Sequence, residues 1–201
     1  MAKEQYHHGD LKNALIRAGT ELLAEEGVTS LSLRQVAARA GVSHSAPYAH
    51  FADKQALIAA ISTEGFRRLY DYMAEAAAEP DPARALEKAA WAYVQFALDN
   101  RACFQLMFSG ILEDGQYPEF SAISHQSFRQ IEELTRRCQA AGYLRPGPVD
   151  VAALSLWSQV HGFVCLYLEG QISHTILNRA PLRDLLRQTL RQITISTNPT
   201  E

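Results

Sequence analysis

The chain has 201 residues, of which 47% are hydrophobic and 20% are charged, as expected for a soluble globular protein. This length allows one domain or two small ones with a substantial core. The formal net charge of -3 rules out overall basicity as an argument for a nucleic-acid partner, so any such argument depends on where the charges lie.

Helical periodicity dominates the chain, and the alternation typical of strands is almost absent. Leu11, Leu15, Ala18 and Leu22 recur at spacings of four, three and four, which places them on one helix face. The pattern predicts an all-α fold of about nine helices, with a polar end at residues 196–201 that frays. The helices are expected from near Asp10 to Gly27, then at residues 33–40, 44–51, 54–78, 82–100, 101–108, 118–141, 149–169 and 181–195.

The second and third predicted helices form a helix-turn-helix pattern. Ser32 and Gln35 have the spacing of a capping box, which starts the second helix. Gly41 then supplies the positive φ that a tight turn requires, and Ser43 is expected to cap the third helix. Small Ala37 allows the close crossing of the two helices. An ordinary αα-hairpin with a glycine turn has the same spacing, so the pattern alone does not decide between the two.

The distribution of charge around this hairpin favours DNA binding. No Asp or Glu lies between Gly27 and Ala52, whereas Arg34, Arg39 and two histidines do. A surface without acidic groups is what phosphate contacts require. The predicted DNA-binding residues are Arg34, Gln35, Ser43, His44, Ser45, Ala46, Tyr48, His50 and Lys54. Those at the start of the third helix would face base edges, and the last three would bond to phosphates.

The segment GVSHSAPYAHFADKQAL resembles the DNA-binding domain of the tetracycline-repressor (TetR) family of transcriptional regulators, and the resemblance covers about residues 6–60. Tyr48, Phe51 and Lys54 match the Y-x-x-F-x-x-K pattern of that family. Trp157 and His161-Gly162 resemble the W…HG signature of one C-terminal subgroup. The resemblance implies a helix-turn-helix domain at residues 1–54 and a helical-bundle ligand-binding and dimerisation domain at residues 55–201.

Pro47 departs from the family pattern, which usually has Leu, Val or Ile at this position. A missing N–H in the first turn of a helix costs little, so the third helix is expected to survive. The packing of this helix, and its presentation of His44 and Ser45, are expected to differ from the usual arrangement. No base preference is therefore transferred to this chain.

The C-terminal two-thirds carries many aromatic residues, which could fill a core or line an apolar pocket with a few polar fixtures. The predicted ligand-binding residues are Trp91, Phe104, Phe108, His125, Phe128, Trp157 and His161. His161 is the best single candidate because it lies in a helix otherwise free of charge. The alternatives for His161 are a buried histidine with satisfied hydrogen bonds and a contact in the dimer interface.

Dimerisation is predicted through helix 149–169, which is uncharged between its two acidic ends, and through the last helix, each paired with its copy in a second subunit. The predicted interface residues are Leu154, Leu166, Leu182, Leu185, Leu186 and Ile193. A two-fold axis would place two recognition helices about one turn of DNA apart, which implies a near-palindromic operator.

The run from Val151 to Leu168 has no charged residue and is long enough to be considered a membrane span. Its Ser, Gln and His residues, with no Lys or Arg cluster beside it, favour a buried or interface helix.

The N-terminal residues lack the apolar core of a signal peptide, so no signal peptide is expected. Cys103, Cys138 and Cys165 have no metal or redox spacing, which favours reduced thiols in the cytoplasm.

No cofactor, metal site or enzymatic activity is expected. His7 and His8 are adjacent and would not share a helix face, and the motifs of hydrolases, metalloproteases and phosphate-binding loops are missing. The predicted function is a repressor that binds DNA as a homodimer and is released by a small-molecule effector of unknown identity. The alternatives are a helical carrier or enzyme with a purely structural hairpin, and a regulator that senses a protein partner.

Overall fold

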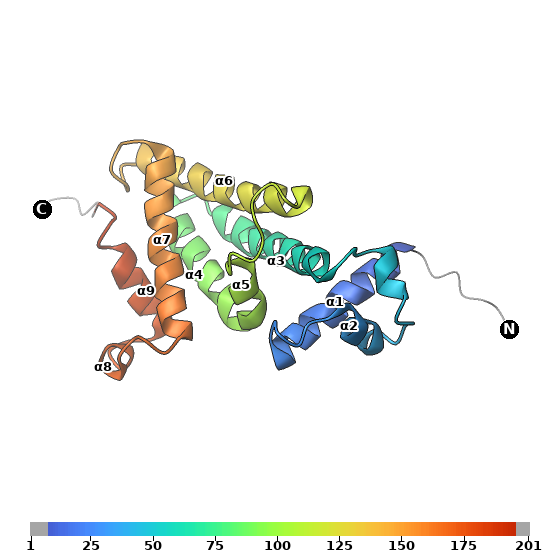
Figure 1. The fold of residues 1–201 in the computed structure, drawn as a ribbon. Coiled ribbons are helices and arrows are strands. Elements are labelled where there is room, and N and C mark those ends of the chain that lie inside the picture. Colours follow the sequence, from blue (N-terminus) through green and yellow to red (C-terminus); the bar gives the residue numbers. More distant parts are fainter. Residues whose placement is uncertain (1–7, 196–201) are drawn as a thin grey trace, which may run out of the picture. The chain divides into compact units, whose positions relative to one another are not determined.

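The structure is a computed structural model that describes residues 8–195 (Figure 1). The predicted frayed end at residues 196–201, His7 of the adjacent histidine pair and the first seven residues of the predicted DNA-binding domain lie outside these residues. Within the described part the chain is helical and contains no strand, which confirms the all-α prediction.

Nine α-helices and one short 3₁₀ helix follow one another in the described residues. They are α1 (His8–Glu26), α2 (Leu33–Arg39), η1 (Ala46–Ala49), α3 (Lys54–Ala77), α4 (Pro82–Asp99), α5 (Arg101–Met107), α6 (Pro118–Ala140), α7 (Val149–Leu168), α8 (His174–Leu177) and α9 (Leu182–Leu190). Two of them begin at an aspartate whose side chain caps a backbone N–H. The backbone N–H of Ala56 donates to Asp53 Oδ1 over 2.8 Å at α3, and that of Arg84 donates to Asp81 Oδ1 over 3.0 Å at α4.

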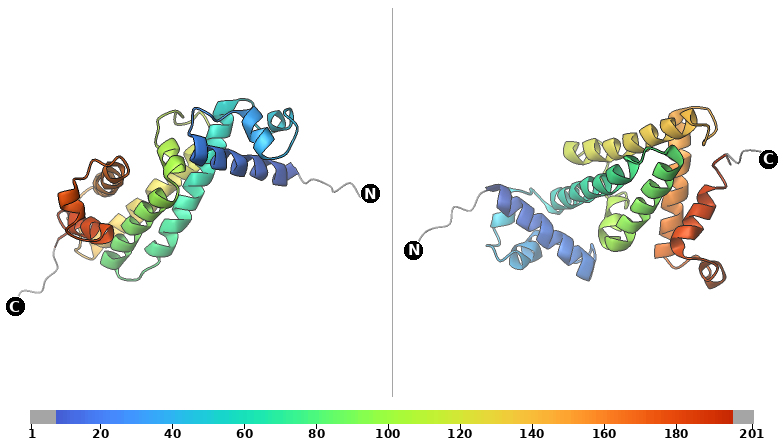
Figure 2. Two further views of the ribbon diagram at one scale, coloured as in Figure 1. Left: turned by 90° about the horizontal axis from the view of Figure 1, so that it is seen from below. Right: turned by 180° about the vertical axis from the view of Figure 1, so that it is seen from behind.

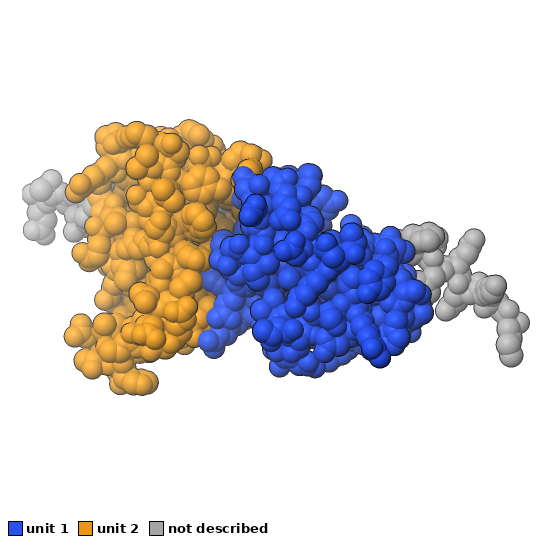
Figure 3. Space-filling model, in the orientation of Figure 1, with its two compact units in different colours: residues 1–67, 100–124 blue, residues 68–99, 125–201 orange. Residues whose placement is uncertain are grey.

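The helices form two compact units (Figure 3), of which unit 1 contains residues 1–67 and 100–124. Here α1 packs against both α2 and α5. Leu15, Val36, Leu57 and Phe104 are at most 1% exposed and form part of its core. The helix-turn-helix pattern therefore folds together with a later segment of the chain, residues 100–124. The predicted functional boundary after residue 54 is a separate matter and stays a prediction.

Unit 2 contains residues 68–99 and 125–201, and α4 packs in it against α7 and α9 (Figure 2). The buried face of α4 carries alanines at positions 85, 89 and 92, whose small side chains let the neighbouring helices approach closely. The C-terminal region differs from the prediction in two respects. A short helix, α8, precedes the last helix, and α9 ends at Leu190 rather than near Ile195.

Helix α7 is the one described helix that is long and apolar enough to cross a membrane. Only length and composition support a span: the mean hydropathy is 1.4 over its best window. One face of α7 is buried in unit 2 through Ala153, Leu156, Val160 and Val164. That face identifies α7 as a packed helix of a globular unit, as the polar residues within it predict.

Candidate nucleic-acid interface and interior cavity

Helix α2 begins at a side-chain cap, as predicted. The backbone N–H of Gln35 donates to Ser32 Oγ over 3.2 Å, and the Ser32 hydroxyl donates to Gln35 Oε1 over 2.7 Å. In a full capping box the Gln35 side chain would bond to the Ser32 backbone N–H, but here the two side chains bond to each other instead. The cap fixes where α2 starts, and therefore where its exposed residues lie.

The turn after α2 has the geometry that the sequence predicts. Gly41 has a φ of +68°, a value that residues with a Cβ rarely adopt. The N–H of Val42 donates to the carbonyl of Ala37 over 3.0 Å, which closes the end of the helix. Ala37 is fully buried beneath the turn, and Phe51 is also buried. These contacts hold the segment that follows the turn against α2.

The predicted third helix, residues 44–51, is wrong in type and length. Residues 46–49 form a single 3₁₀ turn, and Ser43 Oγ lies 3.1 Å from Ser45 Oγ instead of capping a backbone N–H. The physical reason is Pro47, whose nitrogen carries no hydrogen and so cannot bond to the carbonyl of Ser43. The segment instead uses i to i+3 bonds, from Ala46 N to Ser43 O over 3.0 Å and from Tyr48 N to Ser45 O over 3.2 Å. The Pro47 side chain itself is buried.

Most of the predicted DNA-binding side chains are exposed on this part of unit 1. Tyr48 is the most prominent, with 61% of its surface exposed. Ala46 and His50 are half-buried. The exposed members are Arg34, Gln35, Ser43, His44, Ser45, Tyr48 and Lys54. The surface around the turn is therefore polar, and any acidic side chain near it comes from another segment of the chain.

Arg39 is a cation that the acid-free segment suggested for phosphate contact, and the structure assigns it a different role. Its guanidinium bonds to Glu25 over 3.0 and 2.5 Å and approaches Glu21 at 3.6 Å, both on α1. The hydrogen bond to Arg39 also lowers the pKa of Glu25. Arg39 therefore links α2 to α1, and a segment free of acids in sequence is not free of them in space.

Two further predicted phosphate ligands, Lys54 and His50, each have a side-chain nitrogen that is held or buried within unit 1. Lys54 Nζ donates to the carbonyl of Val28 over 3.0 Å, so this side chain is oriented by the loop after α1. The Nε2 atom of His50 is buried and has no hydrogen-bond partner in the described residues. That nitrogen of His50 points into the unit, away from any external phosphate.

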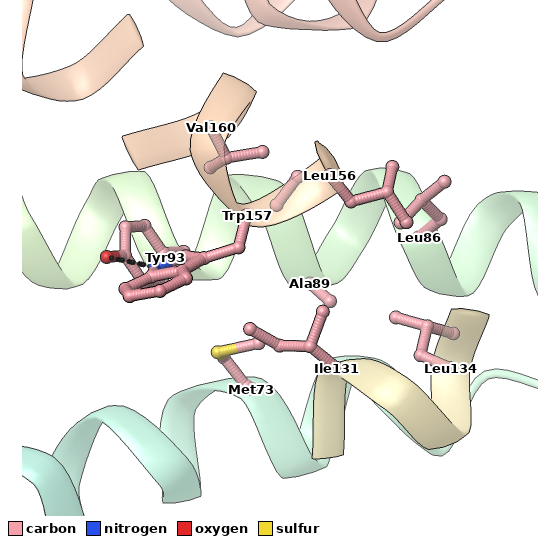
Figure 4. Close-up of a pocket in the computed structure, with 10 residues that line it drawn as sticks. Met73, Leu86, Ala89, Tyr93, Ile131, Leu134, Leu156, Trp157 and Val160 are labelled. Atoms are coloured by element: carbon pink, nitrogen blue, oxygen red, sulfur yellow. Dashed lines mark hydrogen bonds between the residues drawn. The ribbon is translucent and has the colours of Figure 1, made fainter. Parts of the chain in front are cut away.

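Unit 2 contains a small cavity with an internal volume of about 40 Å³, inside a hollow of about 350 Å³ that includes open solvent (Figure 4). Its walls come from four helices, α3, α4, α6 and α7. The lining residues are Met73, Leu86, Ala89, Ala90, Tyr93, Ile131, Leu134, Leu156, Trp157 and Val160. The cavity is thus almost entirely apolar.

A short chain of hydrogen bonds runs along one side of this cavity. Trp157 Nε1 donates to Tyr93 Oη over 3.1 Å, Tyr93 Oη lies 2.8 Å from His161 Nδ1, and His161 Nε2 lies 3.4 Å from Cys165 Sγ. Burial raises the pKa of the Tyr93 phenol and lowers the pKa of His161, so both groups are favoured in their neutral forms. Because Trp157 Nε1 is only a donor, the Tyr93 hydroxyl accepts that bond and can donate its own hydrogen to His161 Nδ1.

The predicted ligand residues do not gather in one place. Trp157 lines the cavity, and His161 and Phe128 contact its ring, with centroid separations of 5.8 and 6.0 Å. Trp91 lies instead beneath the guanidinium of Arg183, 5.7 Å away, and His125 is exposed.

Phe104 and Phe108 belong to unit 1, where their rings lie 5.0 Å apart. The cavity residues that the sequence prediction left out, above all Tyr93, Met73 and Ile131, come from separate helices. The only available signal was the spacing of Leu86, Ala89, Ala90 and Tyr93 on one face of α4.

The predicted dimer residues also divide into two groups. Leu154 and Leu166 on α7 are each 50% exposed, and Ile193 is 36% exposed. Leu182 is half-buried. Leu185 and Leu186, by contrast, are buried in unit 2 and form its own core. The exposed face of α7 also includes Val151, which is 57% exposed. Large apolar side chains therefore gather on one outer face of α7.

The capped α2, the glycine turn and the exposed segment after it define a helix-turn-helix protein of the DNA-binding class. Sequence profiles agree with this class: that of bacterial regulatory proteins of the tetR family matches residues 15–61, and that of the tetracyclin repressor-like C-terminal domain matches residues 86–192. The chain belongs to the TetR family of transcriptional regulators, which are non-enzymatic DNA-binding proteins of the repressor type.

Individual relatives support the same assignment. The chain is 29% identical over 97 residues to an uncharacterized HTH-type transcriptional regulator, YobS, of Bacillus subtilis. The matched segment covers 48% of this chain and 51% of that protein. It is 35% identical over 68 residues to the class D tetracycline repressor protein of Escherichia coli. This match covers 34% of this chain and 31% of the repressor. The chain therefore matches about half of the first of these relatives and less of the second.

A solved structure resembles nearly the whole chain. It is a protein of unknown function from Rhodococcus sp. RHA1, with a TM-score of 0.81 and 33% identity. The match covers 96% of this chain and 100% of that one. The fold is thus shared over nearly the whole chain with another bacterial protein.

Proposed function

We propose that this chain is a cytoplasmic repressor that binds a near-palindromic operator as a homodimer and releases it when a small molecule binds unit 2. DNA contact would involve residues 1–54, and effector binding and dimerisation would involve residues 55–201. The observation that carries the proposal is the exposed polar segment after the Gly41 turn, in which His44, Ser45 and Tyr48 are accessible. Among the described residues, no group of three His, Cys, Asp or Glu side chains could hold a metal ion.

Homodimerisation is supported by the outer face of α7. Val151, Leu154 and Leu166 expose half or more of their surface there, which is unusual for large apolar side chains in one group. A second copy of the same face would cover them through a two-fold interface. Two recognition segments related by that axis would then meet two half-sites of opposite orientation, which makes the operator near-palindromic.

The effector role is supported by the cavity of unit 2, since a regulator that senses small molecules needs a site that can enclose one. A ligand can shift the DNA-bound state only by the difference in its affinity for the bound and released states. Operator release is therefore expected to be partial for weak ligands and to follow ligand concentration.

The test begins with selection of genomic fragments that the purified protein retains, followed by titration of one fragment at several salt concentrations. Arg34→Ala is expected to weaken binding and to reduce the salt slope by about one, because one phosphate contact is lost. Tyr48→Phe, which removes only a hydroxyl, is expected to weaken binding less. Lys88→Ala is the matched control, because Lys88 is an exposed cation of unit 2 that pairs with Glu79. Equal binding by the parent and all three variants at every salt concentration would contradict the proposed interface.

A further inference from the structure

The walls of the unit 2 cavity carry no ionisable charge at neutral pH. None of the ten lining residues is Asp, Glu, Lys, Arg or His. Their heteroatoms are the sulfur of Met73, the hydroxyl of Tyr93 and the ring nitrogen of Trp157. Burial raises the pKa of Tyr93, so its hydroxyl stays protonated. A ligand in this space would find no counter-charge on the wall.

The two polar groups of the wall are engaged with protein atoms. Trp157 Nε1 donates its single hydrogen to Tyr93 Oη, and Tyr93 Oη is also hydrogen-bonded to His161 Nδ1. Figure 4 shows Trp157 and Tyr93 at one end of the lining, with Leu86 and Leu134 at the other end. A polar ligand group that displaced either bond would leave a buried donor or acceptor unpaired, which costs more than the new bond returns.

These two features determine which chemistry the cavity accepts. A charged ligand would lose its hydration without gaining a partner, and this is among the largest penalties in recognition. An apolar ligand would gain contact with Met73, Ile131, Leu134 and Leu156 and would leave the Trp157–Tyr93 bond intact. With about 40 Å³ of internal volume, the cavity is well below the usual range for small-molecule sites, so even a small ligand would have to displace side chains of the wall. The ligand must therefore be small as well as apolar.

We infer that the effector of this regulator is a small, uncharged, predominantly hydrocarbon molecule bound among α3, α4, α6 and α7. The inference rests on the proposed function, because it names the ligand class of the proposed effector site. It excludes organic anions and cations as primary ligands, even though such molecules are more soluble.

The inference can be tested with three probes that share one skeleton: 4-ethyltoluene, 4-ethylbenzoate and 4-ethylbenzylammonium. The chain has two tryptophans, so Trp91→Phe leaves Trp157 as the only one, and its fluorescence reports directly on the cavity wall. The hydrocarbon is expected to change this fluorescence in a saturable way. The carboxylate and the ammonium compound are expected to bind at least about tenfold more weakly, since their charges would be buried without partners.

Two variants locate the binding in the cavity. Ala89→Leu adds three carbons inside the space and is expected to abolish the fluorescence response. Ala83→Leu is the matched control, because Ala83 lies on the same helix and is not part of the lining. Ile131→Lys places a cation on a half-buried wall residue and should reverse the preference toward the carboxylate. Ile131→Lys keeps the test decisive if the Ala89→Leu variant does not fold.

Each outcome bears on the ligand class separately from the DNA-binding function. Binding of the carboxylate or ammonium probe as tightly as the hydrocarbon would overturn the inference, and so would no binding of any probe. Operator binding is measured on the same preparations without probe. Loss of operator binding there would contradict the proposed function, whereas intact operator binding together with the wrong probe preference would contradict only the ligand class.

Discussion

Polar side chains are exposed on the segment after the Gly41 turn, whereas in the cavity of unit 2 they are bonded to each other. On the segment, Ser43, His44 and Ser45 are exposed on a backbone held in place by a 3₁₀ turn. In the cavity, Trp157 and Tyr93 bond to each other and leave an apolar wall. The first arrangement suits a hydrated, charged partner such as DNA, and the second suits a partner that leaves water behind.

This difference shows that residue type alone does not reveal a residue's role. Arg39 is a cation near the turn, yet it is bound to Glu25 of α1. Phe104 and Trp157 are both aromatic, yet one fills the core of unit 1 and the other lines the cavity of unit 2. The neighbours of each side chain, which come from distant parts of the chain, decide between these roles.

The largest expected effect separates core aromatics from cavity aromatics. Phe104 is 1% exposed and packs against Phe108 in unit 1. Phe104→Ala is expected to lower the free energy of unfolding by about 3–5 kcal/mol, because it removes a fully buried ring and leaves a void. Urea unfolding measures the change. Tyr48→Ala, at a 61% exposed position, is the control and is expected to stay within about 0.5 kcal/mol of the parent.

A small loss for Phe104→Ala combined with weaker binding of the hydrocarbon probe would place this residue in the ligand site. That result would remove the distinction between core aromatics in unit 1 and cavity aromatics in unit 2.

A smaller effect is expected where polar atoms satisfy each other in unit 2. Tyr93→Phe removes the hydroxyl that accepts from Trp157 Nε1 and pairs with His161 Nδ1. The loss is expected to be about 1–3 kcal/mol of unfolding free energy, because buried polar atoms lose their partner. Tyr48→Phe is the matched control, since it removes the same atom from an exposed ring. Equal stabilities of the two variants would show that the Trp157–Tyr93–His161 contacts contribute nothing to the fold.

Local features of the fold could be predicted because their causes lie within a few residues. The caps at Ser32, Asp53 and Asp81 and the positive φ of Gly41 depend on neighbours at most four positions away. The type of the third helix was missed because the prediction treated Pro47 as harmless at an N-terminus. In a segment this short, the missing N–H of Pro47 removes the first α-helical bond, and a 3₁₀ turn results.

The candidate site residues were only partly accessible to prediction, because burial depends on contacts between distant segments. Tyr93 and Trp157 are separated by 64 positions, and no periodicity reveals that their polar atoms meet. Leu185 and Leu186 lie on the apolar stripe of the last helix, as an interface residue would. Their burial within unit 2 follows from the packing of α9 against α4 and α7, which the sequence of α9 does not encode alone.

The smallest expected effect is a pH dependence that belongs to unit 2. Burial lowers the pKa of His161 below its ordinary value of about 6.5, and a protonated ring would also compete with Trp157 as a second donor to Tyr93 Oη. The unfolded chain therefore takes up this proton first as the pH falls. Stability from the neutral ring is present above about pH 6.5 and is lost progressively below it, toward the lowered pKa of the folded state.

His161→Gln removes this proton uptake, so its unfolding free energy is expected to change less between pH 7 and pH 5 than that of the parent. The ring is only partly buried, which keeps the difference modest. Urea unfolding at several pH values measures both slopes, and His125→Gln, at an exposed position, serves as the matched histidine control. Parallel curves for the parent and His161→Gln would mean that the ring is as easily protonated in the folded chain as in water. The apolar cavity wall would then stand beside a charge at mildly acidic pH, and its contrast with the polar surface of unit 1 would weaken.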